Sequence, residues 1–183
     1  MTGLDRARGV TLLEMLFTTA TVSALLSLGV PSLVSIANDV RQSTMANGFL
    51  ADLAMARTES IKRGQRVVLC ASSDGLSCVK SGSWQQGRIL FEDRNNNAER
   101  DPGERVLLTE AAAPSDWLIR GNGTVATYIS YHPRGRTRMT NGAFQAGTVT
   151  LCRRSPAGVR ATQIVISSAG RPRSQSRSVD SCT

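Results

Sequence analysis

The sequence predicts an α+β protein in which one long N-terminal helix packs on an antiparallel β-sheet domain. An apolar run from Val10 to Ala37 is long enough to span a membrane and then continues as an amphipathic helical pattern to Gly64. From Arg66 onward, short β-type runs alternate with Gly, Asn and Pro, and no second helical pattern of convincing length follows. We expect four segments: a leader (1–9), a transmembrane half of the helix (10–37), an amphipathic half (38–64) and a β-rich globular domain (65–183).

The apolar run carries a single charge, Glu14. A carboxylate inside a membrane-length segment costs several kcal/mol unless a partner neutralises it. The natural partner is an N-terminal amine, created by cleavage after Gly9 and carried by a neighbouring subunit. The run therefore predicts both processing and polymerisation.

Two other interpretations of this run are open. A secretory signal peptide has an apolar region of roughly 7–15 residues and a small-residue cleavage site, for which residues 35–37 could serve. The run of 28 residues is too long for that and contains Glu14. A plain membrane anchor explains the length, but it explains neither Glu14 nor Gly9.

The amphipathic half of the helix has a regular apolar stripe. Met45, Phe49, Leu53 and Ala56 recur at spacings of three and four residues, so they face one side of a helix. Lys62 and Arg63 place positive charge in the last turn, where the helix dipole favours it. Gly64 then predicts a C-cap.

Seven runs after the helix have strand character. They are 66–71, 87–91, 105–109, 117–120, 124–131, 147–152 and 162–167. Because each is short and bounded by turn residues, we expect antiparallel pairing into sheets that cover the second half of the helix.

Four cysteines predict two disulfides in an exported domain. Of three possible connectivities, Cys70–Cys78 is favoured because the residues between them are turn-rich and can close locally. This leaves Cys152–Cys182, which would pin the C-terminal tail and hold the nearby arginine loop. A zinc site is the rival, but the spacings do not resemble those of zinc ligands.

The N-terminal motif Gly9-Val10-Thr-Leu-Leu-Glu14 resembles the class III signal of type IV pilins and type II secretion pseudopilins, although Val10 stands where that signal usually has Phe. Further landmarks follow in order: 84–93, Gly103-Glu104, 129–135 and 164–171. Together they resemble the GspH/FimT family of minor pilins and pseudopilins, and most closely a FimT-type DNA-binding minor pilin. The resemblance implies a type IV pilin-like fold.

The same resemblance implies a life history for the chain. A prepilin peptidase would cleave after Gly9, Val10 would become the mature and methylated N-terminus, and Glu14 would serve assembly with other pilin subunits. The protein would cross the bacterial inner membrane once and then join an extracellular pilus. The sequence has one His and no nucleophile or phosphate-loop motif, so we expect neither an enzyme nor a cofactor.

Charge is distributed unevenly along the chain. The formal net charge is +8, and 20 of the 22 basic residues are Arg. Residues 134–183 hold nine Arg against the single acid Asp180, whereas residues 90–116 hold seven acids against three Arg. Arg is the cation best suited to bidentate phosphate contacts. The C-terminal third is therefore a candidate surface for a polyanion.

Two Gly-Arg-x-Arg motifs lie within this basic third. In extended chain, alternate Arg side chains point to the same side about 7 Å apart, near the spacing of successive phosphates. FimT-type minor pilins carry such a motif near the C-terminus for contact with DNA, which here implicates Gly170, Arg171 and Arg173. Arg134, Arg136, Arg138 and Arg177 are the further candidates.

The function expected is therefore that of a minor pilin of a type IV pilus, binding DNA without sequence preference for uptake in natural transformation. One alternative is a structural pilin that primes assembly at the filament tip. Another is a GspH-like pseudopilin of a type II secretion system.

Residues 93–104 also place oxygen ligands at calcium-loop spacing. Because Ala98 replaces the usual Gly, and Arg94 and Arg100 add positive charge, an Asn-rich hairpin loop is the preferred interpretation.

Overall fold

The computed structural model describes residues 9–183, with only the backbone described for residues 28–31. The chain divides into two compact units, Met1–Arg41 and Gln42–Thr183. One helix, α1 (Leu12–Arg63), contributes to both units and has the length expected from the sequence. Residues 1–8, most of the expected leader, lie outside the described part.

The first unit contains the beginning of α1. The Thr11 hydroxyl accepts a hydrogen bond from the backbone N–H of Glu14 at 3.3 Å, which makes Thr11 an N-cap. The helix then continues without interruption through Pro31. Its most apolar stretch has a mean hydropathy of 1.8 and is entirely unburied. By length and composition this helix could cross a membrane.

In the second unit, the apolar stripe of α1 forms the centre of the core. Phe49, Leu53 and Ala56 are completely buried, as the spacing predicted. The helix ends at Arg63, and the next residue, Gly64, has φ +63° and donates its N–H to the carbonyl of Ile61 at 3.3 Å. The predicted C-cap is thus confirmed, because this left-handed conformation favours glycine.

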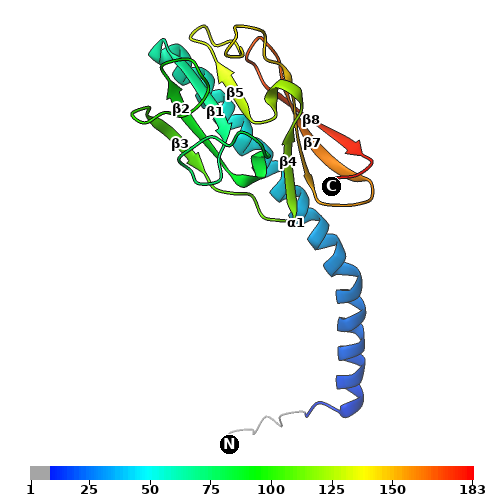
Figure 1. The fold of residues 1–183 in the computed structure, drawn as a ribbon. Helices are drawn as coiled ribbons and strands as arrows, with labels where there is room; N and C mark the ends of the chain where they lie inside the picture. Colours follow the sequence, from blue (N-terminus) through cyan, green and yellow to red (C-terminus); the bar gives the residue numbers. More distant parts are fainter. Residues whose placement is uncertain (1–8) are drawn as a thin grey trace, which may run out of the picture. The chain divides into compact units, whose positions relative to one another are not determined.

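Two four-stranded antiparallel sheets accompany the helix (Figure 1). The first has the order β3 (Val106–Glu110), β2 (Arg88–Asp93), β1 (Arg66–Ala71) and β5 (Tyr128–Tyr131). The second has the order β4 (Trp117–Gly121), β6 (Gly147–Arg153), β7 (Val159–Ile166) and β8 (Arg173–Val179). Of two single-turn 3₁₀ helices, η1 (Trp84–Gln86) lies between β1 and β2 of the first sheet, and η2 (Gly123–Val125) lies between β4 and β5, where the chain passes from the second sheet to the first.

Both sheets share one core with the helix. Leu69 and Leu90 contribute from the first sheet, and Leu151 and Ile164 from the second, to the cluster that surrounds Phe49. Successive side chains of a strand point to opposite faces of its sheet. Ile164 faces the core, so the residues next to it in β7 lie on the opposite face of the second sheet.

Two parts of the predicted strand pattern are wrong. The run 124–131 begins with η2, because Val125 turns inward to the core and its carbonyl accepts the indole N–H of Trp84 at 3.0 Å. The pattern also lacks a strand after residue 167, whereas the serine-rich end of the chain forms β8, which pairs along β7. Its side chains are almost all exposed, so no hydrophobic alternation marked it in the sequence.

Candidate nucleic-acid interface

The two Gly-Arg-x-Arg motifs meet in space. Gly135 and Gly170 both have left-handed backbones, with φ of +71° and +73°. A Cβ on Gly170 would lie 2.0 Å from the carbonyl oxygen of Gly135, which no side chain tolerates. Residues 132–138 and 167–173, here called the arginine loops, therefore pack backbone against backbone at a point where only glycine fits.

Helix α1 and buried polar groups hold the arginine loops in place. Arg57 Nε donates to the carbonyl of Gly135 at 3.1 Å, and Ser60 Oγ donates to the carbonyl of His132 at 3.3 Å. The Thr137 hydroxyl lies 2.8 Å from the carbonyl oxygen of Ser167 and 2.8 Å from that of Gln145. The first loop is thus tied to the helix on one side and to the second loop on the other.

Five of the predicted arginines are available for contact with a ligand. Arg134, Arg136, Arg171, Arg173 and Arg177 are exposed. None of these five lies within ion-pair distance of a carboxylate in the described part of the chain, residues 9–183. Their positive charge is therefore not neutralised locally.

Arg138 is more constrained than its place in the motif suggested. Its side chain is half-buried, its Nη1 donates to the carbonyl of Gly142 at 2.8 Å, and its guanidinium lies 5.4 Å from the ring centre of Phe144. These contacts close the hairpin that follows the first arginine loop, so Arg138 is less free than Arg136.

Arg171 and Arg173 do not project together from one extended loop as expected. Arg171 and Pro172 line a hollow of about 430 Å³ with Leu50 and Ala54 of α1. Arg173 is instead the first residue of β8 and pairs with Val165, which places it on the sheet face that points away from the helix. The expectation that alternate Arg side chains point to the same side holds only for an extended chain. Here the chain turns at Gly170 and becomes extended only at Arg173.

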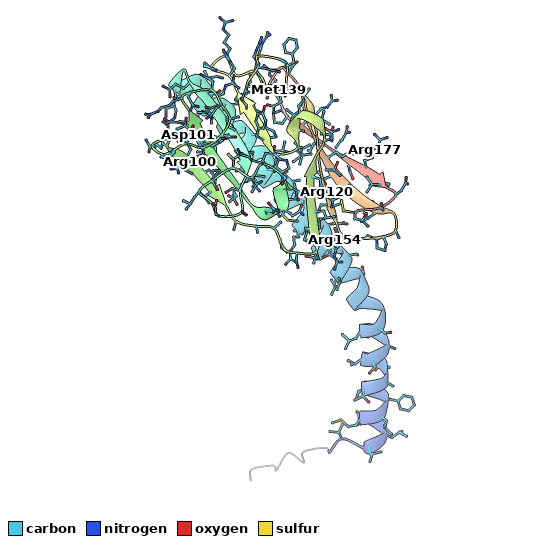
Figure 2. The ribbon with its side chains drawn as sticks, viewed as in Figure 1. Arg100, Asp101, Arg120, Met139, Arg154 and Arg177 are labelled. Carbon is cyan, nitrogen blue, oxygen red and sulfur yellow. A yellow bond between two sulfur atoms is a disulfide. The ribbon has the colours of Figure 1, made fainter. Side chains whose placement is uncertain are left out.

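Arg177 continues the basic face of β8. It pairs with Ala161 and lies two positions along from Gln175, on the same face as Arg173. Figure 2 shows its side chain on β8 and that of Arg120 on β4. The positive surface therefore extends from the arginine loops along the outer edge strand of the second sheet.

A second hollow, of about 720 Å³, lies beside the first arginine loop and is lined by Arg66, His132, Arg134, Arg136, Arg138 and Gly142. Arg66 is buried, and its Nη1 donates to Ser130 Oγ at 2.6 Å and to the carbonyl of Arg138 at 3.1 Å. We call this concave region the basic hollow. The sequence did not point to Arg66 or His132, because neither belongs to an arginine motif.

The pKa of His132 depends on the burial and the positive charges of the basic hollow. Its pKa is lowered from 6.5, first by burial and then by the positive charges of Arg66, Arg138 and Arg134. Its Nδ1 accepts the backbone N–H of Arg134 at 3.4 Å, a bond that only the neutral ring makes. A bound anion would oppose these effects and raise the pKa of His132.

The structure joins Cys70 to Cys78 and Cys152 to Cys182, with Cα–Cα distances of 5.6 and 6.2 Å. This is the expected pairing. The second disulfide follows the C-terminal end of β8, whereas the second arginine loop leads into its first residue, Arg173. The expectation that this disulfide directly holds the loop is therefore wrong, since the Gly135–Gly170 contact does so.

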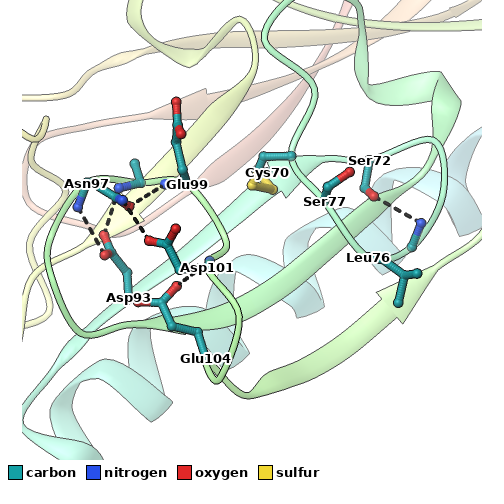
Figure 3. The surroundings of a disulfide bond; sticks show 12 residues. Cys70, Ser72, Leu76, Ser77, Asp93, Asn97, Glu99, Asp101 and Glu104 are labelled. Atoms are coloured by element: carbon teal, nitrogen blue, oxygen red, sulfur yellow. Dashed lines mark hydrogen bonds between the residues drawn. A yellow bond between two sulfur atoms is a disulfide. The ribbon is translucent and has the colours of Figure 1, made fainter.

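Residues 93–104 form a loop closed by its own acidic side chains (Figure 3). Asp93 accepts the N–H groups of Asn97 and Ala98 at 3.1 and 3.0 Å, and Glu104 accepts that of Asp101 at 3.0 Å. Burial raises the pKa of Asp93, whereas hydrogen bonds from two Asn side chains lower that of Asp101. Within residues 9–183, no three His, Cys, Asp or Glu side chains converge to hold a metal ion.

Comparison with known proteins agrees with this fold. The family model described as type II transport protein GspH matches residues 45–170. The chain is 32% identical over 102 residues to the pilin-like protein PilA1 of Thermus thermophilus, a match that covers 56% of this chain and 58% of that relative. The chain thus spans somewhat over half the length of this curated relative.

Solved structures show the same fold. The type IV minor pilin FimU of Pseudomonas aeruginosa superimposes with a TM-score of 0.59 at 14% identity, covering 81% of this chain and 99% of FimU. A second crystal form of FimU gives a TM-score of 0.56 at 15% identity, covering 77% and 99%. The chain belongs to the GspH family and has a type IV pilin-like fold.

Proposed function

We propose that this protein is a minor pilin of a type IV pilus that binds DNA without sequence preference during uptake for natural transformation. The observation that carries the proposal is the meeting of the arginine loops, at the contact between Gly135 and Gly170. Two short basic motifs far apart in sequence are brought into contact, and their exposed arginines have no carboxylate partners within residues 9–183.

Such a surface suits the DNA backbone. Phosphates recur along each strand at regular spacing, and guanidinium groups contact them without reading the bases. Arg134 and Arg136 extend from the first arginine loop, while Arg171 and Arg173 extend from the second. Because the loops are fixed to α1 and to each other, little ordering is required on binding.

The proposal includes the processing of a pilin. A prepilin peptidase would cleave between Gly9 and Val10, after which the apolar part of α1 would anchor the protein in the inner membrane until it joins other pilin subunits in the extracellular filament. N-terminal sequencing of protein from the filament fraction is expected to start at Val10. A start at Asn38 would instead indicate an ordinary signal peptide.

The family match keeps a second candidate open. A pseudopilin of a type II secretion system would have the same fold, and the matching family model carries that description. A structural tip pilin that primes assembly would also keep this fold. Neither requires the exposed arginines of the loops, so a DNA-binding measurement separates them from the proposed function.

The test uses the full chain in a non-ionic detergent and a labelled DNA duplex at low salt. We expect an affinity of about micromolar or weaker, equal for unrelated sequences. Arg171→Ala combined with Arg173→Ala should weaken binding roughly tenfold and reduce transformation. The corresponding change at Arg136 and Arg138 should have a smaller effect, because Arg138 is engaged by Gly142 and Phe144.

A matched control removes the same charge elsewhere. Arg154 and Arg160 are exposed, and they lie near the start of β7, whereas the second arginine loop follows its end. Arg154→Ala combined with Arg160→Ala should leave binding close to that of the unchanged protein. Equal losses in both double variants would mean that net charge, not this surface, attracts DNA, and no binding by the unchanged protein would remove the proposal.

A further inference from the structure

Phe144 is the feature of this surface that phosphate binding leaves unexplained. It is 64% exposed, although it lies in an ordered hairpin beside the basic hollow. A single exposed apolar side chain is common on protein surfaces, so its exposure alone does not mark a site. Its position beside Arg138 and the basic hollow is what sets it apart.

One face of the Phe144 ring is already occupied by a cation. The guanidinium of Arg138 lies over it, 5.4 Å from the ring centre. Arg138 also lines the basic hollow, so the aromatic ring and the hollow share a wall. A phosphate held in the hollow would leave the adjoining nucleotide next to the ring.

The hairpin that presents Phe144 is firmly anchored. Arg138 and Phe144 pair across it, and the carbonyl of Met139 accepts the N–H of Gly142 at 3.0 Å. The next residue, Gln145, is completely buried and bonds through its side chain to the backbones of Ser130, Thr124 and Tyr128. Figure 2 labels Met139, which marks this hairpin. The ring is therefore held in position before any ligand arrives.

We infer that Phe144 is a stacking platform for an unpaired base, and that the arginine surface engages a single-stranded stretch of DNA. Nonspecific single-strand binding combines a positive groove for the backbone with aromatic rings for the bases, and every base offers a face for stacking. In a duplex these faces are covered by neighbouring bases. This inference rests on the proposed function and names the form of DNA that the site prefers.

The test compares probes that differ only in their bases. The full chain in non-ionic detergent is titrated with an oligothymidylate of about 12 nucleotides, with an abasic strand of the same length and with a blunt duplex. We expect the oligothymidylate to bind at least about fivefold tighter than the abasic strand, since stacking of one base contributes a factor of this order or more. Phe144→Ala should abolish that difference, whereas Phe144→Tyr should retain it.

Leu76 provides the control, because it is also 64% exposed but lies in the loop closed by the Cys70–Cys78 disulfide. Leu76→Ala should change nothing. A spectroscopic readout comes from Phe144→Trp, since Trp84 and Trp117 are both buried. Its fluorescence should be quenched by the oligothymidylate and not by the abasic strand.

The outcomes separate this inference from the proposed function. Equal affinity for the oligothymidylate and the abasic strand, or no effect of Phe144→Ala on their ratio, overturns the stacking platform while DNA binding stands. Failure of every probe to bind overturns both. If the circular dichroism of Phe144→Ala differs from that of the unchanged protein, the Tyr and Trp variants decide instead. Loss of the preference for oligothymidylate in Phe144→Tyr, or equal quenching of Phe144→Trp by both strands, then overturns the stacking platform.

Discussion

Gly170 is the residue on which the arrangement of the arginine loops most depends. Its φ of +73° disfavours any other residue, and a Cβ would meet the Gly135 carbonyl at 2.0 Å. Gly170→Ala should therefore lower the free energy of unfolding by about 3 kcal/mol or more, combining backbone strain with a clash. Thermal or denaturant unfolding of the second unit measures this.

Gly103 is a matched control for that change. It has a φ of +92° but no atom within 4 Å of an added Cβ. Gly103→Ala should cost only the strain, about 1–2 kcal/mol, and should leave DNA binding unchanged. Equal destabilisation by the two substitutions would show that the contact between the loops is not tight.

His132 predicts a pH dependence of DNA binding. Because its pKa is lowered from 6.5, the ring is neutral at pH 7 in the free protein. A phosphate in the basic hollow would raise that pKa, so binding would take up a proton and affinity should increase as the pH falls through the raised pKa of the bound state. The gain should reach about tenfold for a shift of one pKa unit, and His132→Gln should remove it.

Protonation of His132 acts on stability in the opposite direction. A lowered pKa in the folded protein means that the unfolded chain binds the proton more readily. This contribution to stability is complete above pH 6.5 and is lost as the pH falls toward the lowered pKa. Unfolding measurements without DNA, between pH 7.5 and about 5, should show this loss of stability in the unchanged protein and not in His132→Gln.

The motifs singled out particular arginines but did not indicate how these are arranged in the fold. Gly170, Arg171 and Arg173 stood out because of their spacing and their place in a basic segment. Nothing local indicated that Gly170 touches Gly135, since contacts between loops far apart in sequence depend on the whole fold. Arg66 was equally inaccessible, because it contributes to the basic hollow from the first residue of β1.

Helix α1 was predictable because its signals agree with one another. The apolar run, the stripe through Phe49 and Leu53, and the cap at Gly64 each indicate the same helix. Strand β8 was not predictable by these means. It is an edge strand with polar side chains, and its pairing with β7 replaces the hydrophobic pattern that would have marked it.

The start of α1 gives Glu14 two possible roles that an experiment separates. Its N–H is capped by Thr11, and a negative charge in the first turn favours the helix dipole. The proposed assembly role instead requires the charge to pair with the amine of a neighbouring subunit. We expect Glu14→Ala to be inserted and processed but largely absent from sheared filaments.

Glu14→Gln provides the comparison, because Gln suits this position of a helix N-terminus as Glu does but carries no charge. If charge pairing drives assembly, Gln should fail like Ala when filament fractions are probed by immunoblotting. Normal incorporation of the Gln protein would assign Glu14 to helix capping and remove the pairing mechanism.

The molecule as a whole separates its charges. Residues 90–116 are acidic, and several of their carboxylates close the loop between β2 and β3, while the basic third forms the arginine loops and β8. An anionic polymer would therefore be attracted to one part of the surface and repelled by another. In the proposed function, this separation would orient DNA on the protein without any contact to a base edge.

The salt dependence of duplex binding is the most direct test of DNA binding by the arginine loops. The logarithm of the affinity should fall linearly with the logarithm of salt concentration, by about 0.9 for each neutralised phosphate. Arg171→Ala with Arg173→Ala should flatten the slope by about two, while Arg154→Ala with Arg160→Ala leaves it unchanged. An unchanged slope in the Arg171/Arg173 variant, or equal flattening in the control, would contradict DNA binding by the arginine loops.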